Sequence, residues 1–175
     1  MAGKSGGMRG LRALAGRLPG KLGERGATAV ELALVLPVLL IMIMGIIEFG
    51  NLFRVMLTMH KASQFGTRMA VTGMGYEDGT RMSYIESATK RILDDLPGQP
   101  AEVTVSSWSG VSASGGGREG NPGMPCELVE VKVDYDYEPV TPLAGLLSYY
   151  GGGFVDKISL SQSDRKVNEP WIPCN

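Results

Sequence analysis

An uninterrupted apolar run constrains this chain more than any other feature of its sequence. Residues 32–47 contain no charge, and the 21 residues of 27–47 are interrupted only by Thr28 and Glu31. As an α-helix with a rise of ~1.5 Å per residue, this segment spans ~30 Å, the thickness of the hydrocarbon core of a bilayer. Its residues are apolar on all sides, which excludes a surface amphipathic helix. We therefore predict a transmembrane helix over residues 27–48.

The charges on the two sides of this run predict its orientation in the membrane. Residues 1–26 contain six basic residues and one acidic residue, whereas the rest of the chain contains eleven basic and seventeen acidic residues. Positive charge is retained on the cytoplasmic side, so we expect a cytoplasmic leader over residues 1–26 and an exported C-terminal part. A nucleic-acid-binding arm is the weaker interpretation, because the basic residues are spaced among Gly, Ala and Leu rather than clustered.

A cleaved secretory signal is the first rival interpretation of the apolar run. Such a signal has an apolar core of about 7–15 residues followed by a small-x-small cleavage site. Here the run is longer, and residues 46–51 offer no such site. We therefore expect the helix to stay in the mature protein. Pro37 is expected to kink it, because proline removes a backbone donor and clashes one turn back, which membrane helices tolerate.

Glu31 is the one ionisable residue inside this apolar segment. A carboxylate near the edge of the bilayer costs roughly 1–3 kcal/mol, and an ionisable residue in a membrane is a functional hypothesis by default. One interpretation is that its side chain snorkels to the cytoplasmic headgroups and has no further role. The other interpretation is that the Glu31 carboxylate pairs with a group of opposite charge. If the chain were cut after Gly26, the new α-amino group of Ala27 would lie close to Glu31 of the next subunit in a helical stack.

The helix is predicted to continue beyond the membrane. From residue 49 to residue 71 apolar side chains recur with i, i+3, i+4, i+7 spacing, and basic and polar side chains populate the other side. Gly73 and Gly75 are expected to end this amphipathic extension, which therefore covers residues 49–73. Together with the membrane span it would form one helix of ~45 residues, ~65 Å long.

Residues 74–175 are predicted to form a small exported head. A second helix is expected over residues 81–96, closed by Pro97 and Gly98. Strands are predicted over three ranges, namely 102–106, 128–137 and 154–164 with Phe154, Ile158 and Leu160 pointing inward. Residues 110–125 are predicted to be a Gly/Ser-rich loop and residues 143–150 a short helical turn. The fold class is α+β: a long N-terminal transmembrane helix continuing into helices packed on an antiparallel β-sheet.

The sequence contains no arrangement of residues that indicates catalysis. His60 is the single histidine, and it is predicted to be a surface residue, so neither a Ser-His-Asp grouping nor a Cys/His cluster with metal-ligand spacing is present. Asp134, Asp136 and Glu138 could form a calcium site, but a solvated strand face is the favoured interpretation. We therefore expect a protein that is not an enzyme and that takes no cofactor, metal or small-molecule substrate.

The two cysteines, Cys126 and Cys174, are predicted to form a disulfide if the head is exported into an oxidising compartment. Free thiols remain the alternative, because the sequence does not supply the geometry. A bridge closing a loop of ~48 residues would contribute ~4 kcal/mol of stability on the chain-entropy model, a large fraction of the total for a small head.

The N-terminal segment resembles the class-III signal of type IV pilins and pseudopilins. Its elements are a basic leader, Gly26, Glu31 five residues later and an apolar helix. Gly26 is the one glycine in the first 50 residues that has a glutamate five positions on. Residues 26–37 and 45–50 are similar to the TadE-like family, pilin-like proteins of the tight-adherence (Tad, Flp, type IVc) pilus system. Residues 126–137 and 168–171 are more weakly similar.

This resemblance implies a function and partners. The chain would be a minor pilin or pseudopilin that a prepilin peptidase cleaves between Gly26 and Ala27. Its partners would be the membrane, other pilin-like subunits and the Tad assembly machinery. It would lie in the inner membrane as a single span with the head periplasmic or extracellular, or be incorporated in a pilus. Leu32 departs from the aromatic residue that often follows the glutamate in processed members. The alternative is an uncleaved single-span anchor whose exported domain binds an envelope or secretion partner.

Overall fold

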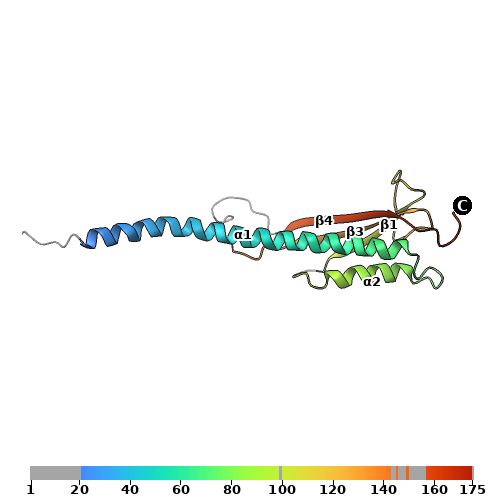
Figure 1. Cartoon of the computed structure of the whole chain (residues 1–175), viewed down its shortest axis with the longest axis horizontal. Helices are drawn as coiled ribbons and strands as arrows, with labels where there is room; N and C mark the ends of the chain where they lie inside the picture. The colour runs from blue at the N-terminus through green and yellow to red at the C-terminus, as the bar shows by residue number, and fades with distance from the viewer. Residues whose placement is uncertain (1–20, 99, 143–144, 146–148, 150–156, 175) are drawn as a thin grey trace, which may run out of the picture. The chain divides into compact units, whose positions relative to one another are not determined.

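The computed structural model describes residues 21–98, 100–142, 145, 149 and 157–174. Within these residues the chain forms two helices and four strands, in the order α1, α2, β1, β2, β3, β4 (Figure 1). It divides into two compact units, Met1–Ile43 and Met44–Asn175, and we call the second one the head unit. The predicted fold class, α+β with a long N-terminal apolar helix and an antiparallel sheet, is confirmed.

The first helix, α1, covers Lys21–Val71 and therefore begins six residues before the start of the predicted membrane span. The hydrophobic pattern locates only the apolar residues of a helix, so it does not detect a polar helical turn that precedes them. Residues 21–26 contain no proline, so the helical hydrogen bonding continues backwards through them. At its other end α1 is followed by Gly73, whose φ of 67° is a left-handed conformation that glycine adopts without strain.

The second helix, α2, covers Arg81–Leu93 and is three residues shorter than predicted. Two features of the sequence explain its earlier end. Asp94 and Asp95 place negative charge at the negative end of the helix dipole. Pro97 disfavours the helical conformation for Leu96, whose amide instead closes a turn onto the Leu93 carbonyl at 2.9 Å.

The sheet contains four strands in the order β2-β1-β3-β4, with every neighbouring pair antiparallel. Their bounds are Glu102–Trp108 for β1, Arg118–Glu119 for β2, Leu128–Tyr137 for β3 and Ile158–Val167 for β4. The central strand β3 pairs with β1 from Glu102↔Asp134 to Trp108↔Leu128, and with β4 from Tyr137↔Ile158 to Leu128↔Val167.

The observed strands differ from the prediction mainly at their ends. β1 continues to Trp108, and β4 continues to Val167, because pairing with β3 provides backbone partners beyond the alternating pattern. The predicted Gly/Ser-rich loop contains β2, a two-residue strand paired with β1. Ile158 and Leu160 pack against the core as predicted. Phe154 and most of the predicted turn at 143–150 lie outside the described residues.

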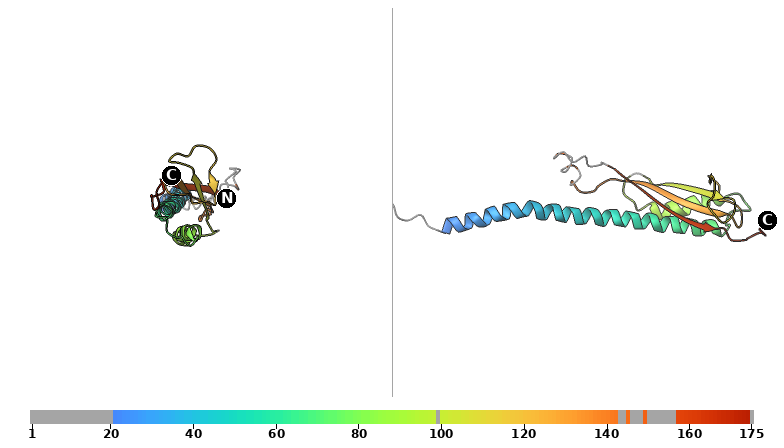
Figure 2. Two further views of the ribbon diagram at one scale, coloured as in Figure 1. Left: turned by 90° about the vertical axis from the view of Figure 1, so that its right-hand side faces the viewer. Right: turned by 90° about the horizontal axis from the view of Figure 1, so that it is seen from above.

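Both helices pack on one face of the sheet (Figure 2). The alternation predicted for β3 determines this face, because its odd-numbered residues from Val129 to Tyr137 are all buried. One core cluster joins Val55, Met59 and Ala62 of α1 to Leu93 of α2 and to the Tyr137 end of β3. A second cluster joins Ala70 and Ile85 to Val105, Val129 and Val131.

Gly66 is where α1 approaches its neighbours most tightly. A Cβ atom built on Gly66 would collide with the Thr89 hydroxyl of α2 and would lie 3.0 Å from Cγ1 of Val131. Thr89 is buried and its hydroxyl donates to the Ile85 carbonyl at 2.7 Å, so it has little freedom to move away. A residue without a side chain at position 66 therefore permits α1, α2 and β3 to meet closely at this point.

We predict that Gly66→Ala lowers the free energy of unfolding of the head by about 1–2 kcal/mol, because over-packing a close contact outweighs the gain in helix propensity. Gly50→Ala is the matched control, since Gly50 is also helical and a Cβ there meets nothing within 4 Å. The control is expected to raise stability by up to about 1 kcal/mol. Near-UV circular dichroism during denaturation of the full chain in detergent measures both. Equal effects of the two substitutions would contradict the packing argument.

The C-terminal segment is fastened to the end of α1. The Glu169 amide donates to the Val71 carbonyl at 3.0 Å, and the Trp171 indole packs on Gly73, where a Cβ would lie 2.7 Å from ring atom Cε3. The Arg81 guanidinium stands over the Trp171 ring, 4.6 Å from its centroid. A long tail of irregular backbone thus gains a fixed position from one aromatic side chain.

Arg81 connects three segments at this end of the head unit. Its Nη2 atom donates to the carbonyls of Ala70 at 2.7 Å and Pro122 at 3.1 Å, and Nη1 donates to the Gly123 carbonyl. Burial lowers the pKa of Arg81 to about 10, so it remains a cation at neutral pH. Charge-assisted bonds to three carbonyls compensate for that burial and tie α1, α2 and the 122–123 turn together.

Candidate functional site

The predicted processing position lies inside a helix. Gly26 and Ala27 fall within α1, in the unit Met1–Ile43, five and six residues after its start at Lys21. Gly26 is exposed, and a Cβ there would meet nothing within 4 Å. Each glycine costs a helix ~1 kcal/mol relative to alanine, so Gly23 and Gly26 make this first part of α1 the easiest to unwind. An enzyme that cleaves here would act on a weak stretch of helix.

Glu31 lies one helical turn beyond Ala27, on the same face of α1. Its side chain is exposed and has no hydrogen-bond or ion-pair partner among the described residues. The carboxylate is therefore accessible to a cation supplied from outside its own unit. Glu31 and the backbone nitrogen of Ala27 thus lie on one face of the helix, as their spacing of four residues predicts.

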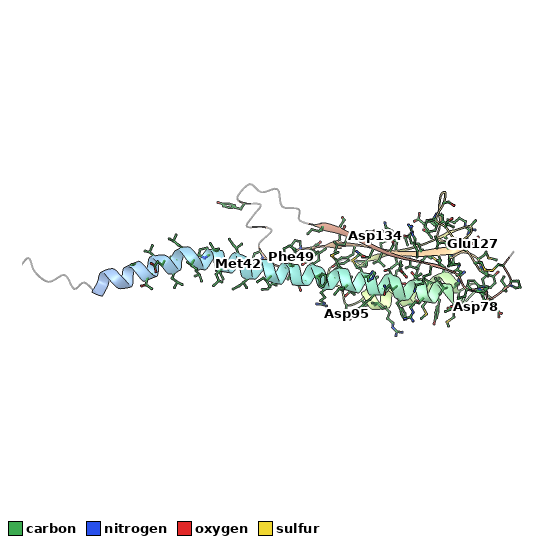
Figure 3. The ribbon with its side chains drawn as sticks, turned by 45° about the horizontal axis from the view of Figure 1, so that its top comes forward. Met42, Phe49, Asp78, Asp95, Glu127 and Asp134 are labelled. Atoms are coloured by element: carbon green, nitrogen blue, oxygen red, sulfur yellow. A yellow bond between two sulfur atoms is a disulfide. The ribbon has the colours of Figure 1, made fainter. Side chains whose placement is uncertain are left out.

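Among the described residues, no side chain in the most apolar part of α1 is buried (Figure 3). Its exposed large apolar residues, from Val30 to Ile47, are 43–71 % exposed. Pro37 lies within this part, and the helix continues through it. Among the described residues, Gly26–Val71 is the one helix that is long and apolar enough to cross a membrane. These properties suit a single-span membrane anchor.

Glu48 is a functional candidate that sequence analysis did not assign a role. Its carboxylate accepts hydrogen bonds from the Tyr137 hydroxyl, the Val140 amide at 3.2 Å, and both the amide and the hydroxyl of Thr141 at 2.9 and 2.7 Å. The four donors come from the end of β3 and the segment that follows it. We call this arrangement the Glu48 clamp. Within the head unit it fixes the 140–141 segment to α1.

The helical register places Glu48 toward the sheet. Leu52, Val55 and Met59 follow it at intervals of four, three and four residues, and Val55 and Met59 are core residues. An acidic residue in register with a buried stripe is the signal that could have identified it from sequence. Burial, and then the hydrogen bond to Glu48, raise the pKa of the Tyr137 hydroxyl, so Tyr137 keeps its proton and stays a donor.

We predict that Glu48→Ala lowers the free energy of unfolding of the head by about 3 kcal/mol, because four donors lose a charged acceptor. Glu48→Gln retains the size and one acceptor oxygen but presents an NH₂ group to donors, so a loss of about 1–2 kcal/mol is expected. Denaturation of the full chain in detergent and hydrogen exchange at the Val140 and Thr141 amides measure the effect.

The control is Glu119→Gln, which changes the charge of the chain equally at an exposed site on β2. Its stability and its exchange pattern are expected to match those of the wild type. Unchanged protection of the Val140 and Thr141 amides in Glu48→Ala would show that the clamp does not hold this segment.

The polar residues considered as metal ligands are occupied by partners within the chain. Asp134 pairs with Lys132 at 2.8 Å, and the Ser159 hydroxyl donates to Asp136 at 2.7 Å. Glu138 pairs with Lys157 at 3.1 Å. Within the part of the chain that the structure describes, no group of three or more His, Cys, Asp or Glu residues is arranged to hold a metal ion. His60 is exposed and contacts the Gln64 side chain at 3.0 Å.

Cys126 and Cys174 form a disulfide in the structure, with their Cα atoms 6.0 Å apart. The bridge lies next to a buried asparagine, Asn168, whose backbone carbonyl accepts from the Cys126 amide at 3.1 Å. The Asn168 side chain donates to the carbonyls of Pro122 and Met124 at 3.0 and 2.9 Å. Covalent and polar contacts together hold the tail that carries Trp171 against the 122–127 segment.

Comparison with known families agrees with the arrangement of Gly26, Glu31 and the apolar helix. The family model described as TadE-like protein matches residues 26–68, which are 43 of the 175 residues. The predicted resemblance to the TadE-like family is thereby confirmed over residues 26–68. The matched segment also contains Glu48 and Gly66. Comparison with curated proteins and with solved structures finds no match.

Proposed function

We propose that this chain, through its TadE-like segment, is a minor pilin or pseudopilin that takes part in assembly of a Tad pilus for surface adherence. The observation that carries the proposal is the exposed apolar helix with Glu31 five residues after Gly26, inside the matched segment. A helix that the described residues of its own chain leave unburied is suited first to lipid and then to neighbouring helices of an assembly. The chain has no catalytic role in this proposal; it is the substrate of a prepilin peptidase.

Processing after Gly26 would give Glu31 a partner. The new α-amino group of Ala27 carries a positive charge, and a carboxylate that meets it in a low-dielectric environment gains more than it would in water. Glu31 would thereby lower the cost of moving the helix from lipid into an assembly. In a helical stack of subunits, the amine that meets Glu31 would be that of the next subunit.

The head supports a minor rather than a major subunit. Cleavage after Gly26 leaves 149 of the 175 residues, most of them in an α+β unit with its own core. By the family resemblance, major subunits of this system are small and helical. A folded head of this size on every subunit would differ from that pattern, so a minor or priming position is favoured.

We predict that the mature protein begins at Ala27 and that Gly26→Val leaves Met1 in place. The matched control is Gly23→Val, since Gly23 is also a leader glycine but has Thr28, not a glutamate, five residues on. Mass spectrometry of the intact protein, purified from cells that contain a prepilin peptidase, measures both. An intact leader on the wild-type chain in such cells would overturn the proposed processing.

We predict that Glu31→Gln inserts into the membrane normally but reduces piliation at least tenfold, because it removes the charge while it retains the shape. Glu24→Gln is the control, because Glu24 lies in the leader that processing removes. Membrane fractionation and counts of pili per cell report insertion and assembly separately. Normal piliation in Glu31→Gln would remove the role assigned to this carboxylate.

An uncleaved single-span anchor is the second candidate function, favoured by the helical backbone through Gly26 and Ala27. In that case the head would bind an envelope or secretion partner, and neither Gly26 nor Glu31 would matter. Replacing residues 27–47 with an unrelated transmembrane sequence separates the two candidates. The anchor retains its function in that chimera, whereas the pilin-like subunit loses assembly.

A further inference from the structure

A cavity lies at the end of the head unit where the chain turns from α1 into α2, and we call it the tail cavity. Its volume is about 430 Å³, which is within the range of ~300–1,000 Å³ that is usual for ligand pockets. The 73–78 turn forms one wall, and Trp171 and Ile172 of the C-terminal tail form the other. Figure 3 labels Asp78 at this end of the head unit, remote from Phe49. The proposed processing and assembly use the N-terminal helix and leave this cavity without a role.

Residues 143–156, most of which lie outside the described part of the chain, cannot reach the tail cavity. Both ends of this stretch are held near Glu48, because Thr141 and Tyr137 donate to its carboxylate and Ile158 lies opposite Tyr137 on the neighbouring strand. A stretch of this length that returns to its starting point extends at most ~25 Å from its ends. Val71, where the cavity begins, lies ~35 Å further along α1 than Glu48.

The walls of the tail cavity are held in place by contacts within the chain. The Tyr76 amide donates to the Gly73 carbonyl at 3.0 Å, and the Arg81 amide donates to the Gly75 carbonyl at 3.0 Å. Gly75 has a φ of 78°, and a Cβ there would lie 2.8 Å from the Arg81 amide nitrogen, so this tight turn requires glycine. The disulfide of Cys174 fixes the tail on the other side. A preformed cavity loses little conformational entropy when it binds a ligand.

The charges that line the tail cavity favour a cation. Glu77 and Asp78 both line it and both are exposed. The Thr80 hydroxyl and amide donate to Oδ1 of Asp78 at 2.7 and 3.2 Å, which lowers the pKa of Asp78 and keeps it ionised at neutral pH. The neighbouring cation, Arg81, is buried and already donates to three backbone carbonyls. An anionic ligand would instead meet two like charges at the surface of the cavity.

The apolar lining indicates the shape of that cation. The Trp171 ring packs on Gly73 and has the Arg81 guanidinium 4.6 Å from its centroid, which leaves little of the ring free for a flat ligand to stack on. Tyr76, whose ring centroid lies 6.0 Å from that of Trp171, and Ile172 are both exposed. These three side chains form an apolar wall of the cavity, and an alkyl chain that ends in an ammonium group suits such a wall beside carboxylates.

We propose that the tail cavity binds the side chain of a lysine that another protein presents. The alkyl stem of this lysine contacts the apolar wall, and its ammonium group pairs with Glu77 and Asp78. Burial of the stem and charge-assisted hydrogen bonds to two carboxylates both favour the complex. The interaction uses no residue of the N-terminal apolar helix, so it does not depend on cleavage of the leader or on pilus assembly.

NMR spectroscopy of the purified full chain in detergent, labelled with ¹⁵N-tryptophan, tests this inference. The chain contains two tryptophans, and the spectrum of Trp108→Phe identifies the indole signal of Trp171. The probe is Nα-acetyl-lysine methylamide, and it is expected to shift the Trp171 signal saturably with a Kd of roughly 1–10 mM. The norleucine analogue of the probe retains most of the alkyl chain but lacks the ammonium group, so it is expected to bind at least tenfold more weakly.

The variant E77Q/D78N removes both charges while it retains the side-chain shapes and an acceptor oxygen for Thr80, and it is expected to bind the lysine probe at least tenfold more weakly. The matched control is D94N/D95N, which removes two exposed carboxylates beyond the end of α2 and is expected to bind like the wild type. Thermal unfolding in detergent shows whether both double variants retain the fold.

Three results would each overturn the inference. They are the lack of a saturable shift, equal binding of the norleucine analogue, and equal affinity in E77Q/D78N. Binding of 1,5-diaminopentane at least tenfold tighter than that of the lysine probe would assign the cavity to a free diamine and would overturn the protein partner. Because all of these measurements use the purified chain with its leader in place, they are independent of whether the chain is processed or assembles into pili.

Discussion

The structure depends on one helix that must satisfy two environments. α1 is apolar on all sides up to Ile47 and one-sided after it, so a single element is first a membrane-type span and then half of a packed interface. Glu48 stands at the change between the two. It is the first charged residue after the apolar run, and its carboxylate uses four donors from the head. A carboxylate would be costly inside the bilayer, but just after the apolar run it holds the 137–141 segment to α1 through charge-assisted hydrogen bonds.

Close packing between α1 and the sheet then determines the rest of the head unit. Gly66 permits the approach to Thr89 and Val131, and Arg81 joins the end of α1 to the turn at Pro122 and Gly123. The disulfide and Trp171 close the same end. The two ends of α1 within the head unit are therefore held by different means, an acceptor at Glu48 and a donor at Arg81. Between them the contact is mostly apolar, and the Thr67 hydroxyl adds a hydrogen bond to the Asp164 carbonyl of β4 at 3.2 Å.

Sequence reasoning succeeded where a periodic pattern extends over many residues and only one face of the element is buried. The bounds of β3 and the buried face of Val129, Val131 and Val133 were predicted because a half-buried strand must alternate. Its failures concern polar residues at element ends, where no pattern exists. The early start of α1 at Lys21, the early end of α2 at Leu93 and the short strand β2 all depend on local backbone hydrogen bonds rather than on burial.

The sequence by itself determined the membrane-type helix, the register of Gly26 with Glu31 and the α+β class. Each of these follows from chain-local quantities, namely the length of an apolar run, a fixed spacing and the period of alternation. Tertiary structure alone decided that Glu48 faces the head and that Gly66 must lack a side chain. Each of these properties depends on two segments that meet in space, and the segments can lie more than forty residues apart in the sequence. The sequence of one segment alone does not specify the segment that it will pack against.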